Sequence, residues 1–308
     1  MSSLHEMTRS FSFLVNPSSG GGAAPEAVVP VARLLRDAGA TVDVTYSPGP
    51  KAMAGLVDSA LERGAVVVSV GGDGMLSSLA GSVSVAGGTL AVLPAGRGND
   101  FARMLGLPES PDDLAKLLLE ADPRRVDLLA LHLPGAGERR VAGSVYSGVD
   151  ARASEIVDRA HWLPKRLQYP YAATRSLATY RPGRYRVTVD GTTAEYTAAT
   201  VVVANSGYYG KGMNIAPAAS VDDGVLDVVV IEAASRWELI RSLPKVYDGG
   251  HVDLDEVTVL TGRRVEVAAD GHRRAGVGGD GEPLGVLSGL TGAPAVVEVL
   301  PGALSILA

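Results

Sequence analysis

Along the first 130 residues, the apolar positions follow two alternating periods. Short continuous runs such as 65–70 are rich in valine, as in strands that are buried on both faces. Between the runs, apolar residues recur at helical spacing, as at Val28, Val31 and Leu35, and Gly39 and Gly64 close two of these stretches. Strand and helix in alternation, with short connections, predict a parallel α/β sheet with right-handed crossovers. The expected strands are 12–15, 41–46, 65–70 and 90–93, and the expected helices are 25–38, 52–63, 75–84 and 99–105.

After about residue 126 the pattern changes to strand-like runs separated by turn dipeptides such as Asp190-Gly191 and Asp270-Gly271, which is typical of antiparallel hairpins. The expected strands are 127–133, 141–146, 185–189, 193–204, 226–231, 257–260, 264–268 and 296–300, with a helical insertion at 151–178 and a short helix at 237–243. We therefore expect an α/β domain at 1–129 and a mainly β domain at 130–295. The sequence leaves open whether the C-terminal tail, residues 296–308, returns to the first domain.

Composition narrows the class of protein. The 308 residues suit about two domains, and 46% hydrophobic residues suffice for a real core. The chain has no cysteine, which excludes disulfides, thiol catalysis and cysteine-based zinc sites. A net charge of -6 argues against a general nucleic-acid binder. No apolar run reaches the roughly 18 residues needed to span a bilayer, and the polar residues 1–10 do not read as a secretory signal. We expect a cytoplasmic protein that visits a membrane only transiently if its substrate is a lipid.

Three glycine-rich loops, at 16–22, 71–74 and 94–100, each follow an expected strand of the first domain. In a parallel sheet the carboxyl ends of strands share one rim, where ligands bind. Glycines there allow backbone N–H groups to approach an anion, so three such loops together suit a triphosphate. One loop alone is more often an ordinary turn, and the sequences match neither a Rossmann fingerprint nor a Walker A motif. Asp73, within the second loop, is a candidate for orienting Mg²⁺ on ATP; the alternative is an N-cap of the following helix.

Taken together, the motifs resemble the catalytic domain of the diacylglycerol kinase family, which includes bacterial lipid kinases and sphingosine kinases. Gly-Gly-Asp-Gly alone is shared with NAD kinases and phosphofructokinases, but the ordered set is specific. It comprises Asn16-Pro17-Ser18-Ser19-Gly20, Gly71-Gly72-Asp73-Gly74 and the stretch 94–103, then 205–212, 215–218, 222–227 and Asp280-Gly281-Glu282.

The resemblance implies an ATP-dependent lipid kinase with a Rossmann-like nucleotide-binding domain and a C-terminal antiparallel β-sandwich that completes the substrate site. The implied nucleotide contacts are Asn16, Pro17, Ser18, Ser19, Gly20, Gly71, Gly72, Asp73, Gly74, Met75, Gly96, Arg97 and Asn99, with Ser47 or Thr45 after the second strand.

The resemblance also implies catalytic and metal residues. Glu282 is the expected general base, and Asp280 orients it or contacts Mg²⁺, although the two roles are interchangeable; a plain hairpin turn is the alternative. A structural Mg²⁺ is expected at the acidic turn, held by the Asp223 carboxylate and the carbonyl groups of Ser220 and Val225. An ordinary Asp-Gly turn is again the alternative.

Two departures from the family pattern concern the nucleotide loops. After the second loop, the family usually has Thr where this chain has Met75, and then an Asn-Glu pair where this chain has Ser77-Ser78. In the third loop, the family usually has Thr where this chain has Arg97. The loss of hydroxyl groups weakens nucleotide contacts, whereas a guanidinium at position 97 can grip phosphate bidentately. We favour compensation by Arg97 over degeneration of the site.

The sequence gives weaker evidence for the class of molecule that accepts the phosphoryl group. Residues 159–186 carry seven Lys or Arg residues, no acid and interleaved aromatic residues, which fits an anionic membrane surface or, equally, a solvated helix face. We expect no nucleic-acid partner, and none of the five histidines has metal-ligand spacing. The sequence leaves open whether the protein forms a homodimer. Besides a lipid kinase, two alternatives remain: a soluble-acceptor kinase resembling NAD kinase, and a nucleotide-binding regulator without activity.

Overall fold

A computed structural model describes residues 9–49, 52–160, 162–164, 167–168, 171–172, 175–176, 179, 181–270 and 275–308. Part of the expected insertion at 151–178 lies outside these residues, as do Lys165, Arg166, Tyr169, Tyr180, Gly271 and three of the histidines (His5, His161 and His272). The chain divides into two compact units: residues 1–126 with 303–308, and residues 127–302. No helix in the described part of the chain is long and apolar enough to cross a membrane.

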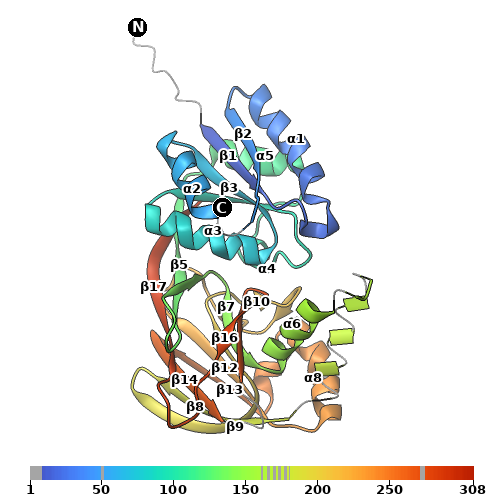
Figure 1. The fold of residues 1–308 in the computed structure, drawn as a ribbon, viewed down its shortest axis with the longest axis vertical. Coiled ribbons are helices and arrows are strands. Elements are labelled where there is room, and N and C mark those ends of the chain that lie inside the picture. The colour runs from blue at the N-terminus through green and yellow to red at the C-terminus, as the bar shows by residue number, and fades with distance from the viewer. Residues whose placement is uncertain are drawn as a thin grey trace. The chain divides into compact units, whose positions relative to one another are not determined.

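The first unit contains a parallel sheet with the strand order β2-β1-β3-β4-β17 (Figure 1). The strands are β1 (Ser10–Val15), β2 (Thr41–Tyr46), β3 (Val66–Gly71), β4 (Thr89–Pro94) and the end of β17 (Ala295–Ile306). Alternate residues such as Phe11, Phe13 and Val15 point to α1 (Ala24–Asp37) and α5 (Pro111–Glu120). The helices α2 (Met53–Glu62) and α3 (Asp73–Ala86) contact the same strands from the other side. The expected parallel α/β architecture is therefore confirmed.

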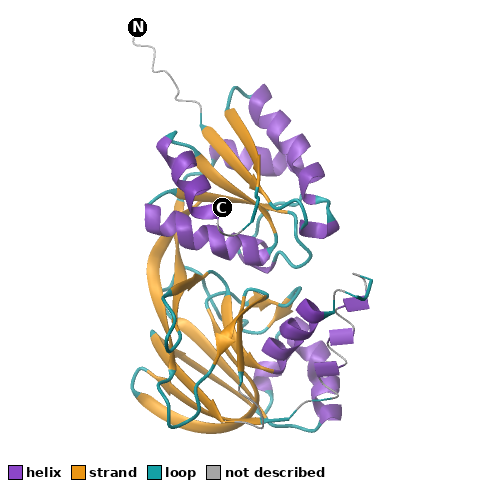
Figure 2. Ribbon diagram, in the orientation of Figure 1, coloured by secondary structure: helices purple, strands orange, loops and turns teal. Residues whose placement is uncertain are grey.

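The second unit consists mainly of strands (Figure 2), and most of them pair in antiparallel fashion. Its core is dominated by valine and leucine. The strands, besides the first part of β17, are β5 (Arg124–His132), β6 (Arg139–Val141), β7 (Ser144–Gly148), β8 (Gly183–Val189), β9 (Thr192–Ala204), β10 (Tyr208–Tyr209), β11 (Met213–Asn214), β12 (Leu226–Glu232), β13 (Val257–Gly262), β14 (Arg264–Asp270), β15 (Gly276–Gly279) and β16 (Glu282–Val286). This β-rich architecture confirms the fold class expected for the second half.

Strand β9 shows how the second unit is layered. Its first half alternates between exposed and partly buried positions, whereas residues 198–204 are all buried. They are buried on both faces because a second apolar cluster, which includes Tyr146, Tyr209 and Ile215, covers the face opposite the sandwich core. Helices α6 (Val149–Arg159) and α8 (Arg236–Asp248) contribute residues to this second cluster.

Several expected element boundaries were wrong. The run 141–146 is two strands, β6 and β7, because the backbone N–H groups at the break donate to a carboxylate instead of to a neighbouring strand. The helix expected to stop at Leu243 continues through Pro244 to Asp248, where Gly249 adopts a left-handed conformation (φ 84°). Strands β15 and β16 were not expected, because their glycine content hides the strand pattern.

Candidate nucleotide and catalytic sites

The glycine-rich loops of the first unit follow β1, β3 and β4, which are neighbouring parallel strands. Two backbone hydrogen bonds continue the strand ladder into the loops. The Asn16 amide donates to the Val70 carbonyl (2.9 Å), and the Ala95 amide donates to the Gly71 carbonyl (3.0 Å). All three loops therefore lie at the carboxyl rim of one sheet, the usual ligand-binding edge of such folds.

Close backbone approaches explain why glycine occupies these loops. A Cβ atom on Gly96 would lie 2.4 Å from the Cα of Gly72, and one on Gly20 (φ +61°) would lie 2.6 Å from the Ala95 carbonyl oxygen. Contacts this short exclude any side chain. The first loop thus meets the third, and the third meets the second, so the chain brings together the motif residues that the sequence places far apart.

The polar side chains of these loops shape the backbone. The Asn16 carboxamide oxygen accepts the Ser18 amide (3.0 Å), and the Asn99 carboxamide oxygen accepts the Gly96 amide (2.9 Å). Asn99 itself has a positive φ of 55°, which Asn tolerates better than most residues. Pro17 and Ser18 are exposed. Asn16 and Asn99 therefore hold the conformation of the loops.

Asp73 occupies the first position of α3, and Gly72, not Asp73, is the N-cap of that helix. The Asp73 carboxylate instead accepts the amide of Phe101 (3.1 Å), in the first turn of α4 (Asp100–Met104). No side-chain hydrogen bond caps the start of α3. A Cβ on Gly98 would lie 2.9 Å from an Asp73 oxygen and 3.1 Å from an Asp100 oxygen, so the third loop passes between two carboxylates.

The remaining predicted nucleotide contacts also lie in the first unit. Ser47 continues β2 by donating its amide to Val15 (2.8 Å), and its hydroxyl accepts the Gly49 amide (3.2 Å). The Met75 sulfur lies 3.0 Å from the position of a Cβ on Gly71, so this side chain covers the second loop. Gly74 follows Asp73 in the first turn of α3. Arg97 is exposed, while Ser77 is buried.

The second unit holds Asp280, in the two-residue turn between β15 and β16. Both turn residues have positive φ, 47° at Asp280 and 86° at Gly281, as in a tight hairpin. The Asp280 carboxylate accepts the backbone amides of Ala142 (3.0 Å), Gly143 (3.0 and 3.1 Å) and Ser144 (2.9 Å). These three residues are buried, so Asp280 fastens the hairpin to the start of β7.

Glu282 is the first residue of β16, directly opposite Gly279, and it is exposed. The residue before it, Gly281, is held by Tyr146, whose hydroxyl accepts the Gly281 backbone amide (3.1 Å). A Cβ on Gly278 would lie 2.4 Å from the Tyr146 ring, so the ring packs directly against the hairpin. Sequence reasoning missed Tyr146; the available signal was one aromatic residue in a short run of small and aliphatic ones.

A buried polar layer lies behind Tyr146. Its ring meets that of Tyr209 edge-on at a centroid distance of 5.7 Å. Burial raises the pKa of Tyr209 strongly, and the charge of Asp150 and a hydrogen bond to it raise this pKa further. Burial also raises the pKa of Asp150, whose carboxylate accepts the Thr200 hydroxyl (2.7 Å). The hairpin of β15 and β16 therefore packs on Tyr146, which in turn packs on buried side chains.

The acidic turn is held by a residue that the sequence analysis missed. The buried Asp127 carboxylate accepts the amides of Gly224 (2.7 Å) and Gly302 (2.6 Å). Within the turn, the exposed Asp223 carboxylate accepts the Val225 amide (3.1 Å), and the Ser220 hydroxyl donates to Asp222 (2.6 Å). The available signal for Asp127 was a single acid within the apolar run 126–131.

The acidic turn fits a hard cation by its donor chemistry. Carboxylate and carbonyl oxygens, such as those of Asp223, Ser220 and Val225, are the ligands that Mg²⁺ prefers. Burial raises the pKa of Asp227, and the negative charge of nearby Asp223 raises this pKa further. No group of three or more acidic, His or Cys residues forms a metal cluster within the described residues, so a site here depends on backbone carbonyls.

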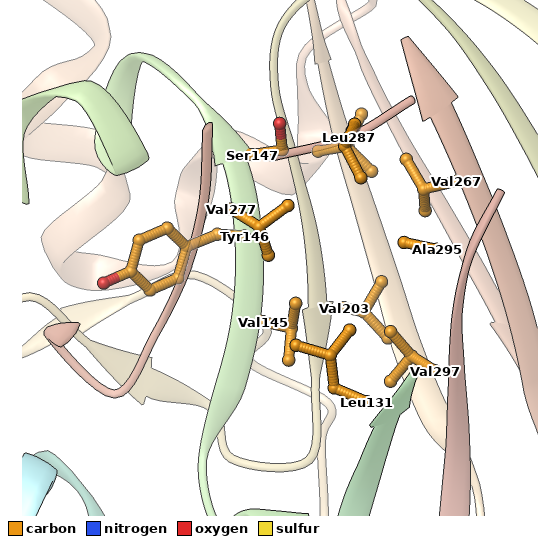
Figure 3. A pocket seen from close by; sticks show the side chains of 11 residues that line it. Leu131, Val145, Tyr146, Ser147, Val203, Val267, Val277, Leu287, Ala295 and Val297 are labelled. Atoms are coloured by element: carbon orange, nitrogen blue, oxygen red, sulfur yellow. The ribbon is translucent and has the colours of Figure 1, made fainter. Parts of the chain in front are cut away.

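The sandwich core contains a small apolar cavity of about 20 Å³ (Figure 3). Leu131, Val203, Val267 and Val297 are among its lining residues, and the Tyr146 hydroxyl points away from it. This volume is about that of one water molecule. It does not accommodate an acyl chain.

The basic and aromatic segment is only partly described. Trp162 meets Tyr171 edge-on, and the Arg175 guanidinium lies 5.7 Å from the centre of the Tyr171 ring. Arg184 and Arg186, in β8, both lie within 4 Å of Glu195 in β9, at 3.8 and 3.1 Å. Two of the seven predicted cations therefore have an acidic partner on the adjacent strand of their hairpin.

Comparisons with known proteins agree with this geometry. A family model of the diacylglycerol kinase catalytic domain matches residues 10–131, and one of the YegS C-terminal NAD kinase beta sandwich-like domain matches residues 143–308. A diacylglycerol kinase from Mycobacterium tuberculosis is 32% identical over 96% of this chain and 93% of its own length. A diacylglycerol kinase from Bacillus subtilis is 23% identical over 75% of this chain and 76% of its own.

The fold is also found among solved structures. A crystal structure of a diacylglycerol kinase from Bacillus anthracis superposes with a TM-score of 0.67 at 18% identity, covering 97% of this chain and 96% of that one. At this identity the likeness concerns the fold, whereas the family models and the relative at 32% identity concern ancestry. The expected resemblance is therefore confirmed, and the chain belongs to the diacylglycerol kinase family of lipid kinases.

Proposed function

We propose that this protein transfers the γ-phosphoryl group of ATP to a hydroxyl of diacylglycerol or a related lipid. The observation that carries the proposal is the contact of three glycine-rich loops at one sheet rim, with Gly96 against Gly72 and Gly20 against Ala95. Backbone contacts of this closeness suit a polyphosphate. Membership of a lipid kinase family supports a lipid acceptor.

The phosphate site we propose uses few cationic side chains. The start of α3 has no side-chain cap, and the partial positive charge of its N-terminus favours an anion. The exposed Arg97 guanidinium replaces the hydroxyl that is usual in the family and grips a phosphate. Asp73 orients the Mg²⁺ that accompanies ATP, because a carboxylate beside a triphosphate needs a cation between them.

The proton leaves the acceptor hydroxyl for Glu282 in this proposal. As the lipid oxygen forms its bond to the γ-phosphorus, the bond from phosphorus to the β,γ-bridging oxygen breaks and ADP departs. Glu282 takes the hydroxyl proton, a step that contributes roughly 10²–10⁴-fold to such rates. Asp280, whose carboxylate accepts three backbone amides, positions Glu282.

A structural Mg²⁺ at the acidic turn, held by Asp223 with the carbonyls of Ser220 and Val225, would supply charge neutralisation there. The protein's own contribution is the Asp127 carboxylate, which holds the Gly224 amide and thereby the shape of the turn. The lipid reaches the protein from a membrane surface.

An acceptor panel tests the function. The full chain is incubated with Mg²⁺, labelled ATP and vesicles containing diacylglycerol, ceramide or a sphingoid base, and with NAD in solution. We expect label in a lipid, diacylglycerol first. Label in NAD would support the soluble-acceptor alternative, and ATP binding without label in any acceptor would support the regulator; either result would contradict the proposal.

The nucleotide site has its own matched pair of variants. Gly96→Ala places a Cβ 2.4 Å from the Gly72 backbone, whereas a Cβ on Gly55, in helix α2, has open space. We expect Gly96→Ala to weaken ATP binding about 100-fold or more by calorimetry, because the loops cannot keep their contact. Gly55→Ala should bind ATP as the natural chain does. Equal ATP affinity in the two variants would refute the proposed loop site.

A further inference from the structure

Helix α8 presents an apolar stripe to solvent. Trp237 is 73% exposed, Ile240 and Leu243 are each 43% exposed, and Tyr247 is 50% exposed. Their spacing of three, three and four residues places them on one side of the helix. Four large apolar side chains at this spacing exceed the scattered exposure that is normal for a protein surface.

The stripe belongs to a firmly held helix. Val246, on an adjacent face of the helix, is buried in the apolar cluster that contains Ile215. A Cβ on Gly249, directly after the helix, would lie 2.7 Å from Pro217, and the buried His251 ring pairs with the Ile215 carbonyl (3.0 Å). At the other end Ser235 and Glu238 form a capping box. The exposed residues are therefore the outer face of an ordered element.

Cations accompany the stripe. Arg236, Arg241 and Lys245 are all exposed, and no salt bridge to any of them is found among the described residues. The acids of the helix are used at its ends: Glu238 accepts the Ser235 amide (2.7 Å), and Asp248 accepts the Gly250 amide (2.9 Å). Cations beside an apolar stripe complement an anionic surface with an apolar interior.

We propose that α8 is the surface by which this protein docks on an anionic membrane. Trp237, Ile240, Leu243 and Tyr247 enter the boundary between headgroups and acyl chains, where Trp and Tyr rings are favoured. Arg236, Arg241 and Lys245 contact lipid phosphates. Pairing two copies through this face is less favourable, because the same three cations would approach one another. The inference rests on the proposed lipid substrate, but membrane binding does not require turnover.

Vesicle sedimentation tests the surface. The full chain is mixed with vesicles of phosphatidylcholine alone or with added phosphatidylglycerol. We expect binding to the anionic vesicles that falls about tenfold in Trp237→Ser/Ile240→Ser, since apolar insertion drives interfacial binding. The control is Val29→Ser/Val85→Ser, at residues that are 65% and 72% exposed on α1 and α3. The control should bind as the natural chain does, and circular dichroism checks that both variants fold.

Fluorescence locates the contact. The chain has two tryptophans, so Trp162→Phe leaves Trp237 as the reporter. We expect its emission to shift to shorter wavelength with anionic vesicles and to return in high salt.

Absent vesicle binding, binding equal in the α8 variant and its control, or an unshifted emission would each overturn the inference. So would a dimer that the α8 variant dissociates, since the face would then belong to a second copy. Vesicle binding through α8 without phosphoryl transfer would leave this inference standing and overturn only the proposed function.

Discussion

Two Asp-Gly hairpins of the second unit have the same backbone but different surroundings. Asp190 (φ 46°) and Gly191 (φ 86°) join β8 to β9 as Asp280 (φ 47°) and Gly281 (φ 86°) join β15 to β16. The Asp190 carboxylate also accepts consecutive backbone amides, those of Arg263 (3.1 Å) and Arg264 (2.9 Å). In both turns the carboxylate ties the hairpin to a neighbouring strand.

The surroundings separate the two turns. Arg263 and Arg264 are exposed, whereas the three residues that donate to Asp280 are buried. Thr192 follows the first turn, and Glu282 follows the second. Tyr146 supports only the second, through its hydrogen bond to Gly281. The aspartate is therefore a structural part of both turns, and the chemistry that we propose for the second turn is assigned to Glu282.

The largest effect is expected from Glu282→Gln. Without the proton acceptor, turnover of lipid should fall by roughly 10²–10⁴-fold, while ATP affinity and the melting temperature stay near those of the natural chain. Initial rates with labelled ATP measure the change. Glu256→Gln, at another exposed acid of this unit, should keep full activity. Full activity in Glu282→Gln would remove the chemical difference between the two turns.

The second effect concerns stability and compares Asp280→Ala with Asp190→Ala. Loss of Asp280 leaves three buried amides without an acceptor, and at about 1–3 kcal/mol for each such group the free energy of unfolding should fall by about 3 kcal/mol or more. Loss of Asp190 should cost about 1 kcal/mol, because water reaches the exposed amides. Urea denaturation measures both. Equal losses would show that burial does not distinguish the turns.

The third pair is Gly281→Ala and Gly191→Ala. Both glycines have φ 86° and open space around a Cβ, so only backbone strain is introduced. We expect each variant to lose about 1–2 kcal/mol of unfolding free energy. Turnover should fall only in Gly281→Ala, which displaces the Glu282 backbone. A loss of turnover in Gly191→Ala would argue for a general effect on the second unit.

The smallest effect is expected from Tyr146→Phe, which removes the acceptor for the Gly281 amide and keeps the ring. We expect about 1 kcal/mol less stability, and a kcat lowered several-fold with an unchanged KM for ATP. Tyr185→Phe, at another buried tyrosine of this unit, should keep both kinetic constants. Unchanged kcat in Tyr146→Phe would show that the hydroxyl does not position Glu282.

Much of the fold followed from local pattern. Apolar runs and helical spacing predicted the parallel unit, and turn dipeptides predicted the antiparallel one, because both depend on neighbours in sequence. The prediction failed where a distant group decides local structure. Residues 142 and 143 leave the strand ladder because their amides donate to Asp280. The strand β15 was hidden by its glycines, of which Gly278 makes room for the Tyr146 ring.

The motif residues and their order could be read from the sequence: glycine-rich loops that suit an anion in our proposal, and an acidic pair late in the chain. Which of these residues contact one another, and which are exposed, became known only from the tertiary structure. It placed Gly96 against Gly72, enclosed the Asp280 carboxylate among backbone amides and left Glu282 exposed. Contact and burial depend on residues that lie tens to more than a hundred positions apart in the chain, whereas residue type and local spacing can be read directly from the sequence.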